Sequence, residues 1–239
     1  MHLAAGVVLQ NREDFTFFSQ RRILSPAVPH LITPGSGVNL RQFAVTLVPC
    51  QPIRFLLVAR LLAEKGVREF VAAAQILRSR HAGCRFRLVG PFERHPGAIR
   101  PFEVQHWVDE GLIEFTGWVD EVYPHLAEAS VFVLPSYYRE GVPRSVLEAM
   151  AVGRPIITTD APGCRETVQS GVNGFLIPPR DVGGLVQAME KFVVRPELLQ
   201  AMGTASRTLA EQRFDVRQVN ASLIEFMALR PSATVRLPT

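Results

Sequence analysis

One segment of the chain, PSYYREGVPRSVLEAMAVGRP at residues 135–155, carries the residues with the clearest chemical potential. A strand is predicted directly before it, and Pro143 suits the first turn of a helix. The backbone amides of residues 142–146 would then be free and would point outward with the positive end of the helix dipole. Such a helix start binds a phosphate group. Because Glu140 and Glu148 flank this helix start, the segment predicts an anion site with two carboxylates beside it.

The two carboxylates suggest that the ligand is more than a phosphate. Helical side chains lean toward the helix N-terminus, so Glu148 can reach back to the mouth of the site. Carboxylates are poor phosphate ligands, but they accept hydrogen bonds from sugar hydroxyls. Glu148 has an alternative role, an ion pair with Arg144 four residues earlier, which would contribute about 0.2–0.5 kcal/mol. Both interpretations stay open from the sequence.

Two cations follow an earlier predicted strand, in the segment ARLLAEKG. Arg60 could bind a diphosphate through paired hydrogen bonds, and Lys65 could bind it as a point charge. Ligands of open parallel sheets lie beyond the carboxyl ends of the strands, so both cations are expected near the helix start described above. The alternative is a solvated loop, and in either case both side chains are expected near the surface.

Composition and motifs exclude several classes of function. The 239 residues carry a net charge of +4, and the basic residues form small groups without interleaved aromatic residues, so no nucleic-acid partner is expected. There is no P-loop motif, and Gly35-Ser36-Gly37 lacks the third glycine of a dinucleotide fingerprint. No Asp-x-Asp pair occurs that could anchor a metal-bridged sugar nucleotide. We therefore expect neither a metal nor a cofactor.

The cysteines and apolar stretches indicate the compartment. Cys50, Cys84 and Cys164 are odd in number and widely spaced, which favours buried thiols in a reducing cytosol over disulfides. The longest uncharged stretches, such as residues 43–53, are too short to cross a bilayer. A cytoplasmic protein is expected. Its mild positive charge suits an anionic small molecule or an acidic membrane surface.

Short apolar runs alternate with helical periodicity from residue 53 onward. Continuous apolar strands indicate burial on both faces, as in parallel sheets. Strands are expected at 53–59, 86–89, 113–115, 131–134, 155–159 and 174–177. Helices are expected at 67–80, 99–110 and 143–152, with a mostly helical region after Asp181. This rhythm predicts an α/β fold with a Rossmann-like, doubly wound parallel sheet.

The first fifty residues have a different pattern. Strands are predicted at 7–9 and 30–32 with a helix at 14–20 between them. Two strands do not form a sheet that is stable by itself. This part is therefore expected to rest on the remainder of the chain or on another polypeptide, with a boundary near Pro49 and Pro52.

Several segments resemble one known family. EGVPRSVLEAMAVGRPII resembles the Glu-x7-Glu segment of glycosyltransferase family 4, a group 1 family of retaining enzymes with the GT-B fold. ARLLAEKG resembles the family's diphosphate-contacting segment, FRLVG and FTGWVDEV resemble its next two strands, and GCRETVQSGVNGFLIPPRD resembles the segment that follows. The resemblance covers roughly residues 11–226 in the right order. The tyrosine pair and the residues REGVPR are most similar to those in enzymes of surface-polysaccharide and lipid-linked oligosaccharide assembly.

The resemblance implies roles for particular residues. Arg60 and Lys65 would contact the donor diphosphate and offset the charge of the departing nucleotide. Glu140, the third residue with an implied catalytic role, would accept hydrogen bonds from the donor sugar, and Glu148 from the ribose. The residues implied to hold phosphate and sugar at the helix start are Gly141, Val142, Pro143, Ser145 and Val146. Thr116 and Gly117 would lie near the base. Family members need no metal, and the expected donor is a UDP-sugar.

The resemblance also implies a domain plan. Residues 1–50 would be a remnant of an N-terminal acceptor domain, about 140–180 residues of which would be missing. Residues 51–214 would bind the nucleotide sugar, 215–230 would form a helix that crosses back to the N-terminal domain, and 231–239 would be a tail. The expected acceptor is lipid-linked or polysaccharide, at the inner face of the cell membrane. The chain by itself would be inactive.

Two other readings of the chain stay open. In the first, it is a non-catalytic or half-enzyme module that binds a sugar nucleotide and needs a separate partner polypeptide. In the second, it is an unrelated α/β protein, such as a sugar-nucleotide epimerase or a phosphate-binding regulator. The pair Glu140 and Glu148 favours a sugar nucleotide over a plain phosphate ligand.

Overall fold

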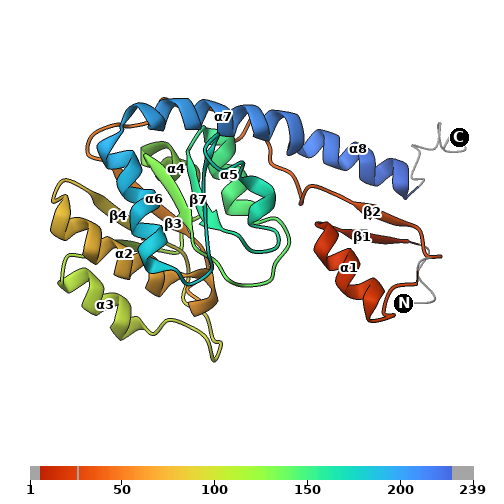
Figure 1. The fold of residues 1–239 in the computed structure, drawn as a ribbon, viewed down its shortest axis with the longest axis horizontal. Helices are drawn as coiled ribbons and strands as arrows, with labels where there is room; N and C mark the ends of the chain where they lie inside the picture. Colours follow the sequence, from red (N-terminus) through yellow and green to blue (C-terminus); the bar gives the residue numbers. More distant parts are fainter. Residues whose placement is uncertain (1–5, 26, 228–239) are drawn as a thin grey trace, which may run out of the picture.

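The computed structural model describes residues 6–25 and 27–227. They form a large lobe around a six-stranded sheet and a small lobe with two strands and one helix (Figure 1). The two long C-terminal helices run along both lobes. The site discussed below lies at the carboxyl ends of the strands of the large sheet.

The large sheet is parallel throughout, with the strand order β5-β4-β3-β6-β7-β8. Its strands are β3 (Arg54–Val58), β4 (Arg85–Val89), β5 (Glu114–Gly117), β6 (Val131–Leu134), β7 (Ile156–Thr159) and β8 (Gly174–Ile177). The chain starts in the middle of the sheet, proceeds to one edge, and then returns to build the other half. The direction of winding therefore reverses between β3 and β6, and ligands of such sheets bind at the carboxyl side of this switch point.

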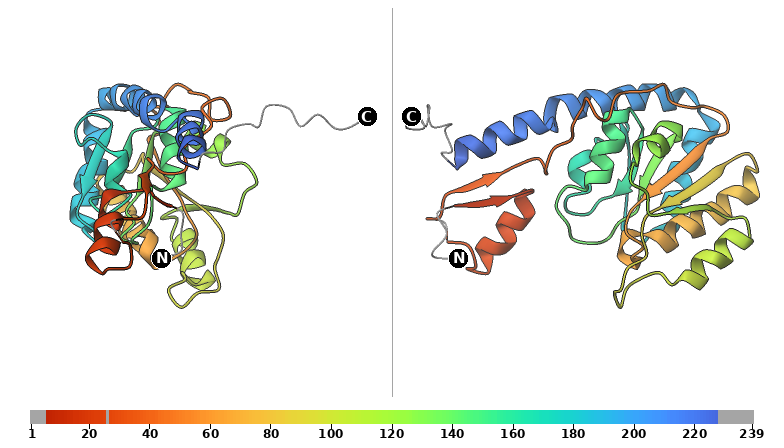
Figure 2. Two further views of the ribbon diagram at one scale, coloured as in Figure 1. Left: turned by 90° about the vertical axis from the view of Figure 1, so that its right-hand side faces the viewer. Right: turned by 180° about the vertical axis from the view of Figure 1, so that it is seen from behind.

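Helices cover both faces of this sheet (Figure 2). One face is covered by α2 (Val67–Arg80), α3 (Pro101–Asp109) and α6 (Val182–Val194). The other is covered by α4 (Tyr123–Glu128) and α5 (Arg144–Val152). Helix α7 (Glu197–Arg213) contributes buried residues to both clusters. The three-layer arrangement confirms the predicted doubly wound α/β fold.

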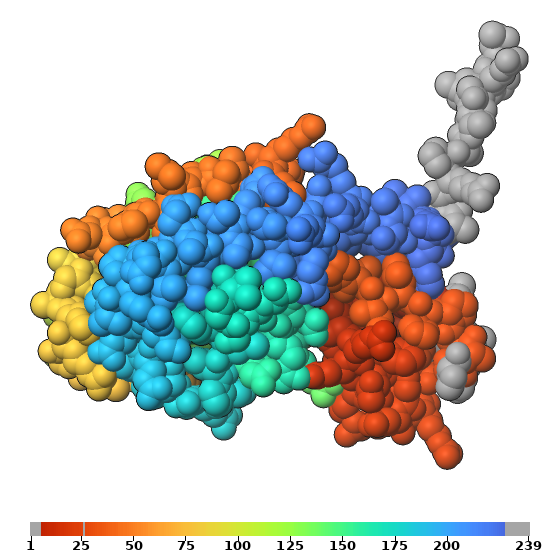
Figure 3. Space-filling view, turned by 45° about the horizontal axis from the view of Figure 1, so that its top comes forward, coloured from red at the N-terminus to blue at the C-terminus, as the bar shows by residue number. Residues whose placement is uncertain are grey.

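The small lobe contains β1 (Val7–Leu9), α1 (Arg12–Gln20) and β2 (His30–Ile32), with β1 and β2 parallel. Helix α8 (Val216–Phe226) lies over this lobe, and the ring of Phe226 lies against Gly6. Figure 3 shows the small lobe, in red and orange, pressed against the large lobe beneath the blue helices. The segment between β2 and β3 links the two lobes. It crosses the junction of α7 and α8 at Val38, whose N–H donates to Phe214 O at 2.7 Å.

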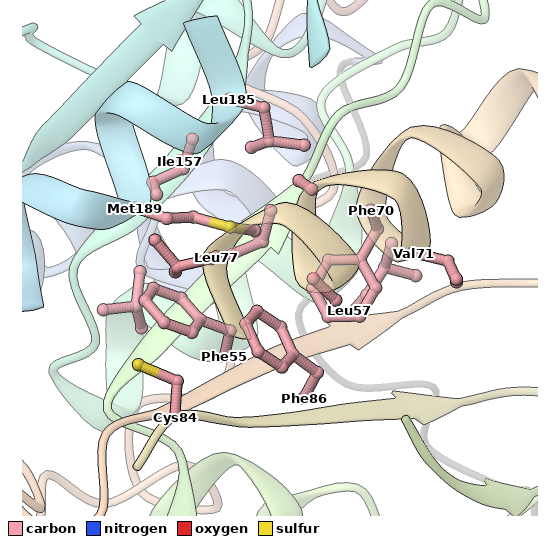
Figure 4. Close-up of a cluster of buried hydrophobic side chains, with 14 of the residues drawn as sticks. Phe55, Leu57, Phe70, Val71, Leu77, Cys84, Phe86, Ile157, Leu185 and Met189 are labelled. Carbon is pink, nitrogen blue, oxygen red and sulfur yellow. The ribbon is translucent and has the colours of Figure 1, made fainter. Parts of the chain in front are cut away.

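The core under α2 and α6 is built from aromatic and aliphatic side chains (Figure 4). Phe55 of β3 stacks on Phe86 of β4 with ring centroids 5.3 Å apart, and Phe70 of α2 meets Phe86 edge-on at 6.0 Å. All three rings are buried. Truncating one of them to alanine would cost about 3–5 kcal/mol, so this packing holds β3, β4 and α2 together.

Gly66 brings two functional segments together. It follows the short 3₁₀ helix η1 (Ala63–Lys65) and precedes α2, with φ +76°, a conformation that glycine adopts without strain. A Cβ at this position would lie 2.2 Å from Pro135 O. The absence of a side chain therefore lets the segment after β3 lie directly against the segment after β6.

The structure confirms most of the expected elements and corrects some details. Helix α4 was missed because it has only six residues. Pro143 is the N-cap of α5 rather than part of its first turn. Cys84 and Cys164 are buried as predicted, but the prediction for Cys50 was wrong, because it lies exposed on the linker before β3. The residues after 227, including the predicted tail at 231–239, lie outside the described part.

Within residues 6–25 and 27–227, no helix is both long enough and apolar enough to span a bilayer.

Candidate functional site

A pocket of about 360 Å³ opens at the switch point of the large sheet. It is lined by residues that follow four neighbouring strands. These are Arg60 and Lys65 after β3, Gly90 and Pro91 after β4, Trp118 and Val119 after β5, and Glu140, Pro143, Arg144 and Ser145 after β6. The structure thus brings together both predicted cations and the first predicted carboxylate. A larger hollow near Cys50 and Cys84 lies at the opposite, amino end of the strands.

Lys65 and Glu140 form an ion pair inside this pocket. Lys65 Nζ lies 2.5 Å from Glu140 Oε2, and Lys65 is only 9% exposed. The expectation that Lys65 lies near the surface was therefore wrong, because the close approach at Gly66 draws it under the loop after β6. The second carboxylate oxygen, Oε1, accepts a hydrogen bond from Ser136 Oγ at 3.0 Å.

Arg60 is an exposed cation that lines the pocket. Its side chain is 56% exposed, and its ion pair with Glu93 is long, at 3.9 Å. An exposed pair of this kind contributes little, so the guanidinium can turn to a ligand without a large loss. Arg60 therefore matches the expectation of a surface cation at the pocket mouth.

Glu148 lies beside the main pocket rather than in it. It lines a second hollow of about 310 Å³, together with Phe43, Tyr123 and others, and this hollow shares Val122 and Arg144 with the main pocket. Burial raises the pKa of Glu148 above its usual range, and the charge of Arg144 opposes this rise. Arg144 Nε donates to Glu148 Oε1 at 2.9 Å, so the alternative ion pair is present. Because Glu148 Oε2 is not part of that bond, the pair does not prevent a ligand contact.

The run of free amides at the start of α5 is shorter than predicted. Val142 N–H donates to the side-chain oxygen of Gln10 at 3.0 Å, and Val146 N–H donates to Pro143 O. Of the residues 142–146, Pro143 has no N–H, and only the amides of Arg144 and Ser145 have no acceptor among the described residues. The side chain of Val146 is buried in the core, and neither Gly141 nor Val142 lines the pocket. The prediction of a free amide at Val142 failed because its acceptor, Gln10, lies in the small lobe, far from Val142 in the sequence.

Neither residue of the predicted base-binding segment lines the pocket. Thr116 is exposed and does not line the pocket, and Gly117 O accepts a hydrogen bond from Gly90 N–H at 2.8 Å. The next two residues, Trp118 and Val119, form the pocket wall. Trp118 is 66% exposed, although it is the largest apolar side chain there. A tryptophan directly after a strand end was the available signal for it.

Sequence reasoning also missed three polar residues around the site. Arg144 was considered only as a partner of Glu148, but it lines both hollows. Ser136 was not assigned, although it is the first polar residue after β6. Gln10 could not be found, because nothing in its local sequence shows that it reaches Val142 from the other lobe.

Known glycosyltransferases resemble the chain in sequence. It is 30% identical over 203 residues to a Salmonella typhimurium protein named as a colanic acid biosynthesis glycosyltransferase, with coverage of 80% of this chain and 49% of that protein. It is 34% identical over 153 residues to a Campylobacter jejuni N,N'-diacetylbacillosaminyl-diphospho-undecaprenol alpha-1,3-N-acetylgalactosaminyltransferase, covering 58% of this chain and 38% of that enzyme. The chain thus spans at most about half the length of these relatives.

Solved structures show the same fold. The sucrose-phosphate synthase of Thermosynechococcus elongatus superimposes with a TM-score of 0.81 at 26% identity, covering 95% of this chain and 58% of that one. The Anabaena protein HepE, solved in complex with UDP, superimposes with a TM-score of 0.80 at 20% identity, covering 95% of this chain and 64% of that one. The parallel sheet with helices on both faces is therefore that of GT-B glycosyltransferases.

The family comparison agrees with these results. The sequence profile of the family "Glycosyl transferases group 1" matches residues 52–194, which is more than half of the chain and includes every lining residue of the main pocket. The match, the strand order and the pocket at the switch point lead to one assignment. The chain belongs to the group 1 glycosyl transferases.

Proposed function

We propose that the chain is the donor-binding part of a retaining, metal-independent glycosyltransferase that uses a UDP-sugar. The observation that carries this proposal is the position of Glu140, which lies against Lys65 in a pocket at the switch point of the sheet. A carboxylate suits sugar hydroxyls, and a neighbouring cation suits a diphosphate. The pocket lies within the 300–1,000 Å³ range of small-molecule sites.

The diphosphate would be bound by positive groups on two sides. Arg60 reaches the pocket from the end of β3, and Lys65 lies on its floor. Arg144 and Ser145 present backbone amides at the start of α5, where the helix dipole also favours an anion. These groups would offset the negative charge that develops on the departing nucleotide, which is how a metal-free site can assist sugar transfer.

The nucleoside would occupy the space between the two hollows. Glu148 is placed to accept hydrogen bonds from the ribose, since its hollow joins the main pocket through Val122 and Arg144. The base would then lie along Trp118 and Val119 on the wall after β5. The complex of the similarly folded HepE with UDP supports the choice of uridine.

Names of relatives support the choice of acceptor. One relative is named for colanic acid biosynthesis and another for transfer to a diphospho-undecaprenol acceptor. We therefore propose a lipid-linked or polysaccharide acceptor for this chain, with peripheral placement at the cytoplasmic face of the membrane. The domain plan inferred from the sequence, with residues 1–50 as part of an acceptor domain and residues 215–230 as a helix crossing back to it, is part of this proposal.

A second candidate function is a donor-binding module that acts with a separate polypeptide. The small lobe favours it. In the described part, β1 and β2 pair only with each other, and α1 buries none of its residues. Two strands and one unburied helix offer little surface to hold an acceptor.

Calorimetric titration tests the proposal directly. The chain should bind UDP and UDP-sugars more tightly than GDP or ADP, and the affinity should be unchanged by EDTA. The variant Glu148→Gln tests the proposed ribose contact. It should lower the affinity for UDP itself, because the ribose is common to all uridine ligands. Binding that disappears in EDTA and returns with magnesium or manganese would contradict the metal-free site. Equal affinity for all three nucleotides would contradict the assignment of uridine.

A further inference from the structure

Ser136 lies beneath the main pocket and contacts the carboxylate that the proposed function assigns to the donor sugar. It is fully buried and does not line the pocket, so it cannot touch a ligand there. Its Oγ lies 3.0 Å from Glu140 Oε1 and 3.1 Å from Glu64 O. A hydroxyl has one proton to donate, so these two acceptors compete for it.

The surrounding hydrogen bonds favour the carboxylate. Glu64 O already accepts the N–H groups of Tyr137 at 2.9 Å and Tyr138 at 3.1 Å. Tyr138 N–H also approaches Ser136 Oγ at 3.3 Å, so the serine oxygen acts as an acceptor there and keeps its proton for another group. A hydrogen bond to an ionised acceptor is stronger than one to a carbonyl. The proton of Ser136 is therefore directed to Glu140.

This contact fixes the orientation of the Glu140 carboxylate. The last torsion of a glutamate side chain is broad, so rotamer preference alone does not set the plane of its carboxylate. Here Oε2 is held by Lys65 at 2.5 Å and Oε1 by Ser136 at 3.0 Å. A carboxylate has about four lone-pair sites, and these two contacts leave others for hydroxyl groups in the pocket.

Lys65 by itself would hold the carboxylate less strictly. The proposed function also assigns Lys65 to the donor diphosphate, and a lysine ammonium is a point charge on a flexible stem. Ser136 is fixed from several sides, since its own carbonyl accepts a hydrogen bond from Thr159 Oγ1 at the end of β7. The rigid contact to Glu140 is thus the one made by serine.

We propose that Ser136 is a positioning residue, which holds the Glu140 carboxylate in the orientation that receives the donor-sugar hydroxyls. The inference rests on the proposed function, because it needs Glu140 to bind the sugar. It predicts that Ser136 affects the sugar portion of the donor and leaves the nucleotide portion alone.

The test is titration of the full chain with UDP and with UDP-glucose, UDP-galactose and their N-acetylated forms. The ratio of the UDP affinity to the affinity of the best-bound conjugate is compared among variants. Ser136→Ala should weaken the conjugate about fivefold to tenfold and change UDP affinity less than twofold. Ser136→Thr keeps the hydroxyl and should restore the ratio. Thr158→Val is the matched control, because it removes a buried hydroxyl that donates to Leu134 O, at 2.7 Å, and that has no hydrogen bond to Glu140 among the described residues.

A double-mutant cycle separates positioning from general stability. In the Glu140→Gln background, Ser136→Ala should change the ratio no further. If Glu140→Gln raises the ratio in the wild-type background but Ser136→Ala leaves it unchanged, the inference fails and the proposed function stands. Equal weakening of UDP and the conjugate in Ser136→Ala, with the same loss of melting temperature as Thr158→Val, would also overturn the inference. If Glu140→Gln itself leaves the ratio unchanged, the sugar-binding role of Glu140 fails and the inference fails with it.

Discussion

Arg60 and Lys65, two of the cations that line the pocket, should contribute differently to binding and to stability. Arg60 is exposed and loosely paired, whereas Lys65 is buried against Glu140. Arg60→Ala should weaken UDP about tenfold to hundredfold, since it removes a charge-assisted contact of about 1.5–3 kcal/mol. The melting temperature of Arg60→Ala should stay within experimental error of the wild-type value. Lys65→Met should weaken UDP and also lower the melting temperature, because it leaves the Glu140 carboxylate without its cation.

Calorimetry and thermal unfolding of the same samples measure both effects. The double variant Lys65→Met with Glu140→Gln is the control. It should recover much of the lost stability, since the uncompensated charge is gone, but it should not recover UDP affinity. A loss of stability in Arg60→Ala with unchanged UDP affinity would mean that Arg60 has a structural role.

Glu148 should give UDP binding a distinct pH dependence. Burial raises the pKa of its carboxyl above the usual value of about 4.3. The ionised form is the one that accepts ribose hydrogen bonds, so UDP affinity should fall as the pH drops through this raised pKa. The effect on folding has the opposite sign. A carboxyl whose pKa is raised in the folded state stabilises the fold at low pH, and this contribution is lost as pH rises through the folded pKa.

Glu148→Gln separates these contributions from those of other carboxyls. The variant should bind UDP more weakly than the wild type at neutral pH and lose this part of the pH dependence. The difference in melting temperature, variant minus wild type, should increase as pH rises through the pKa of Glu148. A wild-type affinity that is constant from pH 7 down to the ordinary glutamate range would contradict the ribose contact.

At the scale of elements, local sequence predicts most of what positions the site. The strand before Glu140 and the helix after it were predicted because β6 is continuously apolar and α5 has helical periodicity. Contacts between distant segments were not predictable in the same way. Lys65 and Glu140 are far apart in sequence and meet only because Gly66 allows close approach. The hydrogen bond from Val142 to Gln10 removed an amide that the sequence had left free.

The loop after β5 provides an optical test of nucleotide binding. Trp118 forms part of the pocket wall and is 66% exposed, whereas Trp107 on α3 packs against the core. A uridine base that lies along Trp118 should quench its fluorescence by stacking. The wild type and Trp107→Phe should therefore both show quenching with UDP, and Trp118→Phe should not. Quenching of normal size in Trp118→Phe would place the base elsewhere in the pocket.

At the scale of the whole molecule, the small lobe is held against the large lobe by polar contacts. Arg139 Nε donates to Asp14 Oδ1 at 3.0 Å, and Arg165 pairs with Glu13, so both acidic residues of the first turn of α1 face the large lobe. The charges of these residues were visible in the sequence, but their pairing was not, because it depends on how the lobes pack. The fold of each lobe could thus be predicted better than the contact between them.

The exposed surface of the small lobe gives the last prediction. Strands β1 and β2 pair only with each other in the described part, and Val8 is 41% exposed on β1. Open strand edges and uncovered apolar side chains favour association. We expect the chain to self-associate at high concentration in light scattering, and to transfer no radiolabelled sugar to lipid-linked acceptors by itself. Val8→Lys should reduce the association without changing UDP affinity. A stable monomer that transfers sugar unaided would contradict the second candidate function, since the acceptor site would then lie within these 239 residues.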